Sequence, residues 1–236
     1  MENDFSQSAH TKGESQVRKA GQFDPSRWQR LEEELGLDHN VEKVFSREDR
    51  GLRIYIRSVD VWKVQINDWP APDHFVQDLN QEAARAVDAR SIPGVVKVRR
   101  IWSDTEKTVL ILDRVPGMQL SRHKFTCVES LRIILQVVRL ALALTRKRIL
   151  HGDLAVHNFI VTPDGQVVVI DFGQAHKAPF WTCVLQNVFW RGEWHGKRTF
   201  PVSGTVARCV EFGLPERARA LYRKILRIAP YAANAD

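Results

Sequence analysis

Apolar and polar residues alternate between residues 41 and 66, as in the run Ile54-Tyr55-Ile56-Arg57. An alternation with a period of two is typical of strands with one buried face. This segment predicts an antiparallel sheet in the first part of the chain. Two further strand patterns follow, at residues 95–102 and 108–112, before Val115-Pro116-Gly117 breaks the pattern. We expect that break to link two lobes.

Helical spacing of apolar residues marks two segments around these strands. Asp24 is an expected N-cap with Pro25 at the first helical position, and Trp28, Leu31 and Leu35 form one stripe that Gly36 ends. Asp73 is the expected cap of a second helix, closed by Pro93-Gly94. Its apolar stripe, which also carries Glu82, consists of Phe75, Val76, Leu79, Ala83, Ala86 and Val87.

The second half of the chain predicts helices around one strand hairpin. The region up to Leu150 is mainly helical, residues 159–170 form the hairpin, and a basic amphipathic helix runs over residues 215–228. We expect residues 1–23 to be disordered, residues 24–228 to form one domain with lobes at 24–112 and 114–228, and residues 229–236 to be a flexible tail.

The composition limits the cellular compartment and the partners that we expect for this domain. Three scattered cysteines predict neither a disulfide framework nor a zinc site, and a cytoplasmic protein is the resulting expectation. The start of the chain shows no secretory signal, and the apolar run 131–144 is shorter than the roughly 20 residues of a membrane span. The net charge of +7 leaves contact with an anionic surface open.

Candidate chemistry gathers at the predicted hairpin. Asn158 enters its first strand and Asp171 leaves its second, and Pro163-Asp164-Gly165 suits the turn between them. A hairpin with this register brings the amide oxygen and the carboxylate side by side. Hard oxygen ligands of this kind suit Mg²⁺. Asp153, in the loop before the hairpin, is expected to face the same point.

The sequence around these residues resembles a known pair of active-site motifs. The stretch His151 to Asn158, followed by Asp171-Phe172-Gly173, is similar to the catalytic loop and metal-binding motif of protein kinases and kinase-like enzymes. The resemblance implies ATP and Mg²⁺ as cofactors, with Asp153 accepting the substrate hydroxyl proton and with Asn158 and Asp171 holding the metal. It also implies that Lys63 is the strand lysine of the ATP site and that Glu82 is its ion-pair partner.

Other residues depart from the kinase pattern. The expected nucleotide-covering loop, residues 46–51, contains Gly51 as its one glycine, and Arg47 or Arg50 is an alternative source of phosphate contacts. Ala155 replaces the usual lysine of serine/threonine kinases, and no Ala-Pro-Glu motif follows Asp171. The chain therefore resembles compact kinases of the RIO and Bud32 types and the lipopolysaccharide core kinases.

Together these features predict an α+β, two-lobed protein-kinase-like fold with a sheet-rich N-lobe and a reduced helical C-lobe. The expected function is transfer of the γ-phosphoryl group of ATP to a hydroxyl acceptor, with a protein Ser or Thr favoured over a small molecule. Replacement of Lys63 by alanine is expected to weaken nucleotide use, whereas replacement of Lys43, on a neighbouring strand, is expected to do little. Phosphorylation of an activation loop is not expected, because Gly152 replaces the arginine that pairs with a phosphorylated loop.

Two alternatives stay open at this point. A sugar or metabolite kinase, including a lipopolysaccharide kinase, fits the same motifs, and a catalytically silent binding module fits the poor glycine loop. Nucleic acid is not an expected partner, although Arg217, Arg219, Arg223, Lys224 and Arg227 make the terminal helix basic. The same helix also carries core-like Leu221, Ile225 and Leu226, so its role stays open.

Overall fold

The computed structural model describes residues 25–37, 40–47, 51–68, 78–123, 125–189, 193–194, 197–198 and 201–226. Its first half is built around a five-stranded sheet in which every neighbouring pair is antiparallel, in the order β1-β2-β3-β5-β4. The strands are β1 (Val41–Arg47), β2 (Leu52–Arg57), β3 (Asp60–Ile66), β4 (Val98–Ser103) and β5 (Lys107–Asp113). The predicted antiparallel sheet is confirmed.

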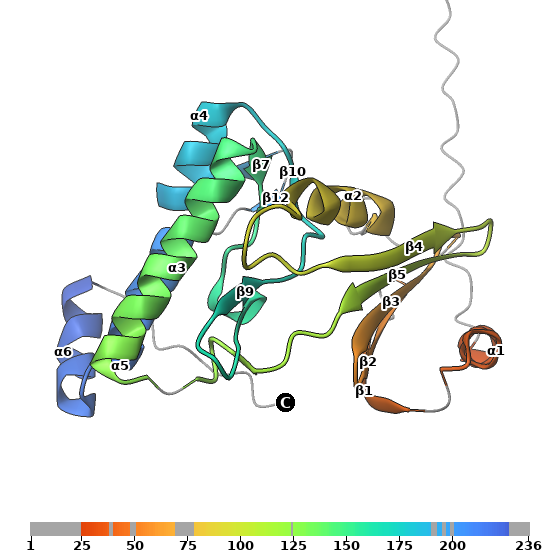
Figure 1. Ribbon diagram of the computed structural model, residues 1–236, viewed down its shortest axis with the longest axis horizontal. Helices are drawn as coiled ribbons and strands as arrows, with labels where there is room; N and C mark the ends of the chain where they lie inside the picture. The colour runs from red at the N-terminus through yellow and green to blue at the C-terminus, as the bar shows by residue number, and fades with distance from the viewer. Residues whose placement is uncertain are drawn as a thin grey trace, which may run out of the picture.

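Two helices cover opposite faces of this sheet, as Figure 1 shows. Helix α1 (Pro25–Leu35) places Trp28 against one face, where Val109 and Ile111 of β5 are buried. Helix α2 (Leu79–Ala89) packs on the face that carries Leu110 and Leu112. Successive residues of a strand point to opposite faces, so one strand serves both helices.

Helix α2 begins later than the sequence predicts. Asp78 is its N-cap, because the carboxylate accepts hydrogen bonds from the backbone N–H groups of Asn80 and Gln81. The expected cap Asp73 is therefore wrong for this helix. Asp73, Phe75 and Val76 lie outside the described residues, as do Asp24 and the terminal segments 1–23 and 229–236.

The second half combines helices with short strand pairs. Helix α3 (Cys127–Arg146) is the longest helix in the described part, and Thr126 and Glu129 form a capping box at its start. The remaining elements are β6 (Met118–Gln119), β7 (Ile149–Leu150), η3 (Val156–Asn158), β8 (Phe159–Val161), β9 (Val167–Val169), β10 (His176–Lys177), α4 (Phe180–Cys183), η4 (Val184–Phe189), β11 (Glu193–Trp194), β12 (Lys197–Arg198), α5 (Val202–Gly213) and α6 (Glu216–Leu226).

Helix α6 is held to α5 by its own arginines. The fully buried carboxylate of Glu211 accepts hydrogen bonds from Arg208 and Arg223, each at 2.7 Å. Arg219 donates to two backbone carbonyls at the end of α5 and in the following turn. A buried carboxylate requires such partners, so these cations of the terminal helix have a structural task. Leu221, which looks like a core residue in the sequence, is 61% exposed, so the helix is attached through these polar contacts.

The two halves share one hydrophobic core. It runs from α2 and the Leu110 face of the sheet to α3 and the β8–β9 hairpin. Val95 forms an isolated bridge to Val169 of β9, and the Val169 N–H donates to the carbonyl of Gly94 at 2.8 Å. The backbone thus joins the halves at the base of the sheet. No helix within the described ranges is long and apolar enough to cross a membrane.

The tight contact at Gly94 generates a stability prediction. Gly94 has φ +85°, and a Cβ there would lie 2.6 Å from the carbonyl oxygen of Val167, whereas Gly165 has φ +79° with open space around it. We expect Gly165→Ala to lower the free energy of unfolding by about 1–2 kcal/mol through backbone strain. Gly94→Ala should cost about 1–3 kcal/mol more because of the clash. Urea unfolding measures both, and equal losses would contradict the close approach.

Candidate active site

The β8–β9 hairpin brings Asn158 and Asp171 to the same end of the strand pair. Phe159 pairs with Val169, and the Ile170 N–H donates to the carbonyl of Asn158 at 2.9 Å. The chain then leaves the hairpin at Asp171, whose φ of +61° is unusual for a residue with a side chain. A left-handed backbone costs on the order of 1 kcal/mol and persists where surrounding contacts demand it. Here the contact is with Lys63.

Lys63 forms the centre of a charged cluster. Its Nζ lies 2.7 Å from Glu82 Oε1 and 2.9 Å from Asp171 Oδ1. Glu82 is 1% exposed and comes from α2, Lys63 comes from β3, and Asp171 follows the hairpin. Three segments that are distant in the sequence therefore meet at one ammonium group. The structure brings together these three residues of the predicted site.

The electrostatics of the cluster keep Lys63 and Asp171 charged. Burial alone would lower the pKa of Lys63, but the nearby carboxylates of Asp171 and Glu82 outweigh burial and raise it. The Lys63 charge in turn lowers the pKa of Asp171 to about 2, against the opposing effect of burial. The Asp171 side chain keeps 45% of its surface exposed, so it can reach a ligand as well as Lys63.

Asp153 lies in the loop before the hairpin and is held there by several contacts. Its N–H donates to His151 Nδ1 at 3.3 Å, and its carbonyl accepts a hydrogen bond from Asn158 Nδ2 at 3.0 Å. Its carboxylate Oδ2 lies 3.3 Å from His157 Nε2. The other oxygen, Oδ1, is buried and has no hydrogen-bond partner among the described residues. A buried carboxylate oxygen without a partner is a candidate site for a proton or cation.

Gly152 shapes the loop before Asp153. Its φ is +84°, and a Cβ would lie 2.9 Å from the Cβ of Gln174, which belongs to the segment after the hairpin. A glycine is therefore required by both conformation and space. The arginine found there in regulated protein kinases would not fit this backbone.

The two histidines of the loop have different surroundings. His151 is completely buried, and its ring meets Phe172 edge-on at 4.7 Å between centroids. Burial lowers the pKa of His151, so the ring is neutral and supports the loop. The hydrogen bond with Asp153 raises the pKa of His157, although burial opposes this effect. His157 is half exposed and lies beside the candidate base.

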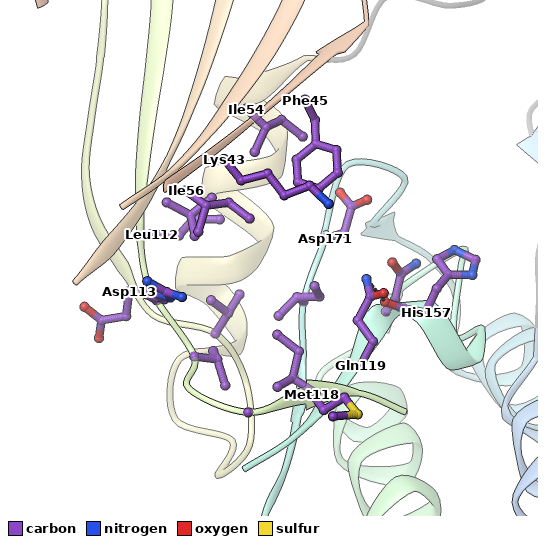
Figure 2. Close-up of a pocket in the computed structure, with 18 of the residues that line it drawn as sticks. Lys43, Phe45, Ile54, Ile56, Leu112, Asp113, Met118, Gln119, His157 and Asp171 are labelled. Carbon is purple, nitrogen blue, oxygen red and sulfur yellow. Dashed lines mark hydrogen bonds between the residues drawn. The ribbon is translucent and has the colours of Figure 1, made fainter. Parts of the chain in front are cut away.

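A cavity of about 540 Å³ lies between the sheet and the hairpin. This volume is typical of pockets for small ligands. Its walls are mostly apolar, and its polar groups include Lys63, Asn158, His157 and Asp171. Figure 2 shows Phe45 and Lys43 on one side of the cavity and Asp171 and His157 on the other. Asn158 uses its side-chain nitrogen on the loop, so its amide oxygen is the atom available to a cation.

Other predicted positions lie differently. Lys43, which was expected to contribute little to nucleotide use, lines the cavity, with Nζ 4.3 Å from the Phe45 ring centroid. Strand β1 therefore places a second lysine at the pocket, a position that the sequence did not indicate. Gly51, with φ +58°, accepts a hydrogen bond from the Ile66 N–H, and it is not among the residues that line the cavity. Arg50 lies outside the described residues.

One contact near the site has no signal in the sequence. Strand β10 pairs with β7, and Lys177 Nζ of β10 lies 3.0 Å from Asp88 Oδ2 on α2. The hydrogen bond from Lys177 is the main reason that the pKa of Asp88 is lowered. The segment after Asp171 is thereby tied to the helix that carries Glu82. Only the fold reveals this pairing.

The described residues offer Mg²⁺ a limited set of oxygen ligands. Among the described residues, no group of three or more His, Cys, Asp or Glu side chains could hold a metal ion on its own. Mg²⁺ commonly uses one or two carboxylates together with substrate phosphates and water. Asn158 and Asp171 at the edge of the cavity fit that mode of binding, and they do not fit an all-protein metal cage.

Comparisons with known proteins show a similarity to kinases. Residues 76–182, slightly less than half of the chain, match the family described as the ABC1 atypical kinase-like domain. The chain is 28% identical to a serine/threonine-protein kinase of Caenorhabditis elegans over 126 residues, which is 49% of this chain and 13% of that protein. It is 29% identical to Aurora kinase A-A of Xenopus laevis over 92 residues, 37% of this chain and 23% of that protein.

A solved structure supports the fold. The Cydia pomonella granulovirus kinase PK-1 is similar with a TM-score of 0.50 and 15% sequence identity, covering 84% of this chain and 78% of that one. The protein therefore has a protein-kinase-like fold, and it is distantly similar to serine/threonine protein kinases. The matched stretches span less than a quarter of these curated relatives. The narrower likeness to RIO, Bud32 and lipopolysaccharide core kinases stays a prediction.

The Asp171–Lys63 pair predicts a pH effect on stability. The pKa of Asp171 is about 2 in the folded protein and about 3.9 in an unfolded chain. The folded state binds fewer protons, so the pair stabilises the protein above pH 3.9, and this contribution disappears as the pH falls towards 2. Asp171→Asn should therefore lose less stability than the wild type between pH 4 and 2 in urea unfolding. Parallel losses would contradict the pairing.

Proposed function

We propose that this chain is a kinase that transfers the γ-phosphoryl group of ATP to a hydroxyl acceptor. The observation that carries the proposal is the meeting of Lys63, Glu82 and Asp171 at a cavity that Asn158 also lines. A buried lysine with two carboxylate partners at a pocket is the arrangement that phosphoryl transfer in kinases requires. The proposal takes residues 24–228 as one kinase-like domain in the cytoplasm.

Each polar residue has a role in this proposal. Lys63 binds the phosphates of ATP, and Glu82 holds the Lys63 side chain in position from α2. Asn158 and Asp171 hold Mg²⁺, which would neutralise charge on the phosphates when bound. Asp153 accepts the proton of the attacking hydroxyl, as its place in the kinase-like loop implies. Asp153 does not itself line the cavity, but its neighbours His157 and Asn158 do. The predicted ATP contact of Gly51 has no support from the cavity, which Gly51 does not line.

Lys43 is an addition to the predicted site. Its side chain lines the cavity on the strand that precedes the loop with Gly51. A second cation over the cavity offsets phosphate charge where a glycine-rich loop would otherwise supply backbone N–H groups. We therefore include Lys43 among the residues that contact the nucleotide.

The acceptor is proposed to be a protein Ser or Thr. The distant similarity to serine/threonine kinases supports this choice. A small-molecule hydroxyl is the second candidate, because Ala155 removes the lysine that is usual in serine/threonine kinases. Incubation with Mg·ATP labelled at the γ-phosphate and with lysate proteins, glycans or metabolites distinguishes these acceptors. Absence of transfer to all three, despite nucleotide binding, would favour a silent binding module.

Two carboxylate variants test the assigned roles. Asp153→Asn should slow transfer by on the order of 10² to 10⁴ while nucleotide affinity is retained, as expected for a positioned base. Asp171→Ala should abolish metal-dependent turnover, because it removes a proposed metal ligand. Asp164→Asn is the control, since it lies in the exposed turn of the same hairpin. Equal loss of binding and turnover in Asp153→Asn would indicate a structural role instead.

We also expect activity without phosphorylation of the segment after Asp171. No hydroxyl side chain occurs between Gly173 and Thr182, and the Lys177–Asp88 pair already ties this segment to α2. Phosphatase treatment should leave turnover unchanged. Lys177→Gln should lower kcat several-fold, and the exchange of Lys177 and Asp88 should restore part of it, because opposite charges again meet. Loss of turnover after phosphatase treatment, regained on phosphorylation of Thr182, would contradict the expectation.

A further inference from the structure

Helix α3 carries apolar side chains on the face that points away from the core. Val128, Leu131, Leu135 and Leu142 are between 41% and 63% exposed. Residues at i, i+3, i+7 and i+14 lie on one side of an α-helix. We call these four residues the outer face of α3. At 1.5 Å per residue the row is about 20 Å long. It is therefore larger than the single exposed apolar residues that are normal on a protein surface.

A row of cations borders the outer face. Arg132, Arg139 and Arg146 are exposed and follow one another at intervals of seven residues, so they run along one edge of it. The single acidic residue of α3, Glu129, is engaged in the capping box with Thr126. The exposed side of the helix thus combines aliphatic surface with positive charge. On another side, α3 packs against α5, where Ser130 donates to the carbonyl of Cys209.

The neighbouring elements α4 and η4 pack against α3 and are also apolar on the outside. Trp181 is 73% exposed and Phe189 is 67% exposed, with Leu185 between them. The spacing of four residues places these three on one side of their own element. Bulky exposed aromatic residues next to basic ones are typical of surfaces that lie at a membrane interface.

The charge pattern decides between occupants. A second copy that paired antiparallel along the outer face would set one arginine row against the other, which is unfavourable. Nucleic acid would use the arginines, but it gains nothing from exposed leucines. An anionic bilayer uses both, because phosphates attract the arginines and acyl chains accept the leucines. Net charge of +7 favours the same partner.

Helix α3 does not take part in the cavity, so a partner bound to its outer face would not block the cavity. None of the residues that line the cavity belongs to α3, and the core side of the helix faces β9. In Figure 1, α3 lies on the left of the molecule, on the side away from the five-stranded sheet. We propose that the outer face of α3 binds an anionic lipid bilayer, with its leucines among the acyl chains and Arg132, Arg139 and Arg146 at the headgroup phosphates. This surface is independent of the terminal helix α6.

Vesicle binding by the full chain tests this proposal. Vesicles of equal parts phosphatidylserine and phosphatidylcholine should bind the protein at least about tenfold more tightly than phosphatidylcholine alone, and added salt should weaken binding. The double variant Leu131→Ser/Leu135→Ser and the triple variant Arg132→Gln/Arg139→Gln/Arg146→Gln should each lose most of this binding. Leu221→Ser is the matched control, because Leu221 is 61% exposed on α6. Circular dichroism verifies that each variant is folded.

Several outcomes would overturn the proposal. Equal binding to both vesicle types, or none, removes the anionic bilayer as the partner. Loss of binding in the arginine variant but not in the leucine variant would indicate a purely electrostatic contact, which a test with DNA would identify. A dimer in light scattering that the leucine variant dissociates, without vesicle binding, would assign the outer face to self-association. Loss of binding in Leu221→Ser alone would move the site to α6.

Discussion

The rest of this structure depends on the charge of Lys63. An ammonium group that is almost completely buried requires partners, since removal from water costs several kcal/mol unless opposite charges and hydrogen bonds compensate. Glu82 and Asp171 provide them at 2.7 and 2.9 Å. For both carboxylates to reach Lys63 Nζ, α2 must pack against the sheet and the β8–β9 hairpin must end close to Lys63. Correct packing of the two halves is therefore tied to the geometry of the candidate site.

The same requirement explains two local features that would otherwise be unfavourable. The left-handed backbone at Asp171 is strained, but it turns the carboxylate towards Lys63. Asp88 and Lys177 are only partly buried, and such a pair contributes roughly 0–1 kcal/mol. The position of the Lys177–Asp88 pair matters more than its energy, because the pair joins the segment after Asp171 to the helix that carries Glu82. In the proposed kinase, a modest ion pair thus supports the position of a buried one.

Local patterns in the sequence account for much of the fold and for part of the site. Alternation predicted the sheet, and the turn at Pro163-Asp164-Gly165 predicted the β8–β9 hairpin, because both signals are contained within a few neighbouring residues. The start of α2 was missed, since Asp73 and Asp78 are the same residue type and both suit a cap, so the local sequence does not distinguish them. Lys43 and the Lys177–Asp88 pair were also missed. Their partners are distant in sequence, and only the completed fold brings them together.

The positive charge of the chain shows why composition alone is ambiguous. The terminal helix α6 is rich in basic residues, yet Arg223 compensates the buried Glu211 and Arg219 binds backbone carbonyls. These cations stabilise the fold. The arginines of α3 border an exposed apolar row, and Glu129, the one acidic residue of the helix, lies near Arg132 at its start, with Arg139 and Arg146 further along. Charge that is already compensated within the protein attracts a partner weakly, so the distribution of carboxylates, more than the number of cations, determines where an anionic partner binds.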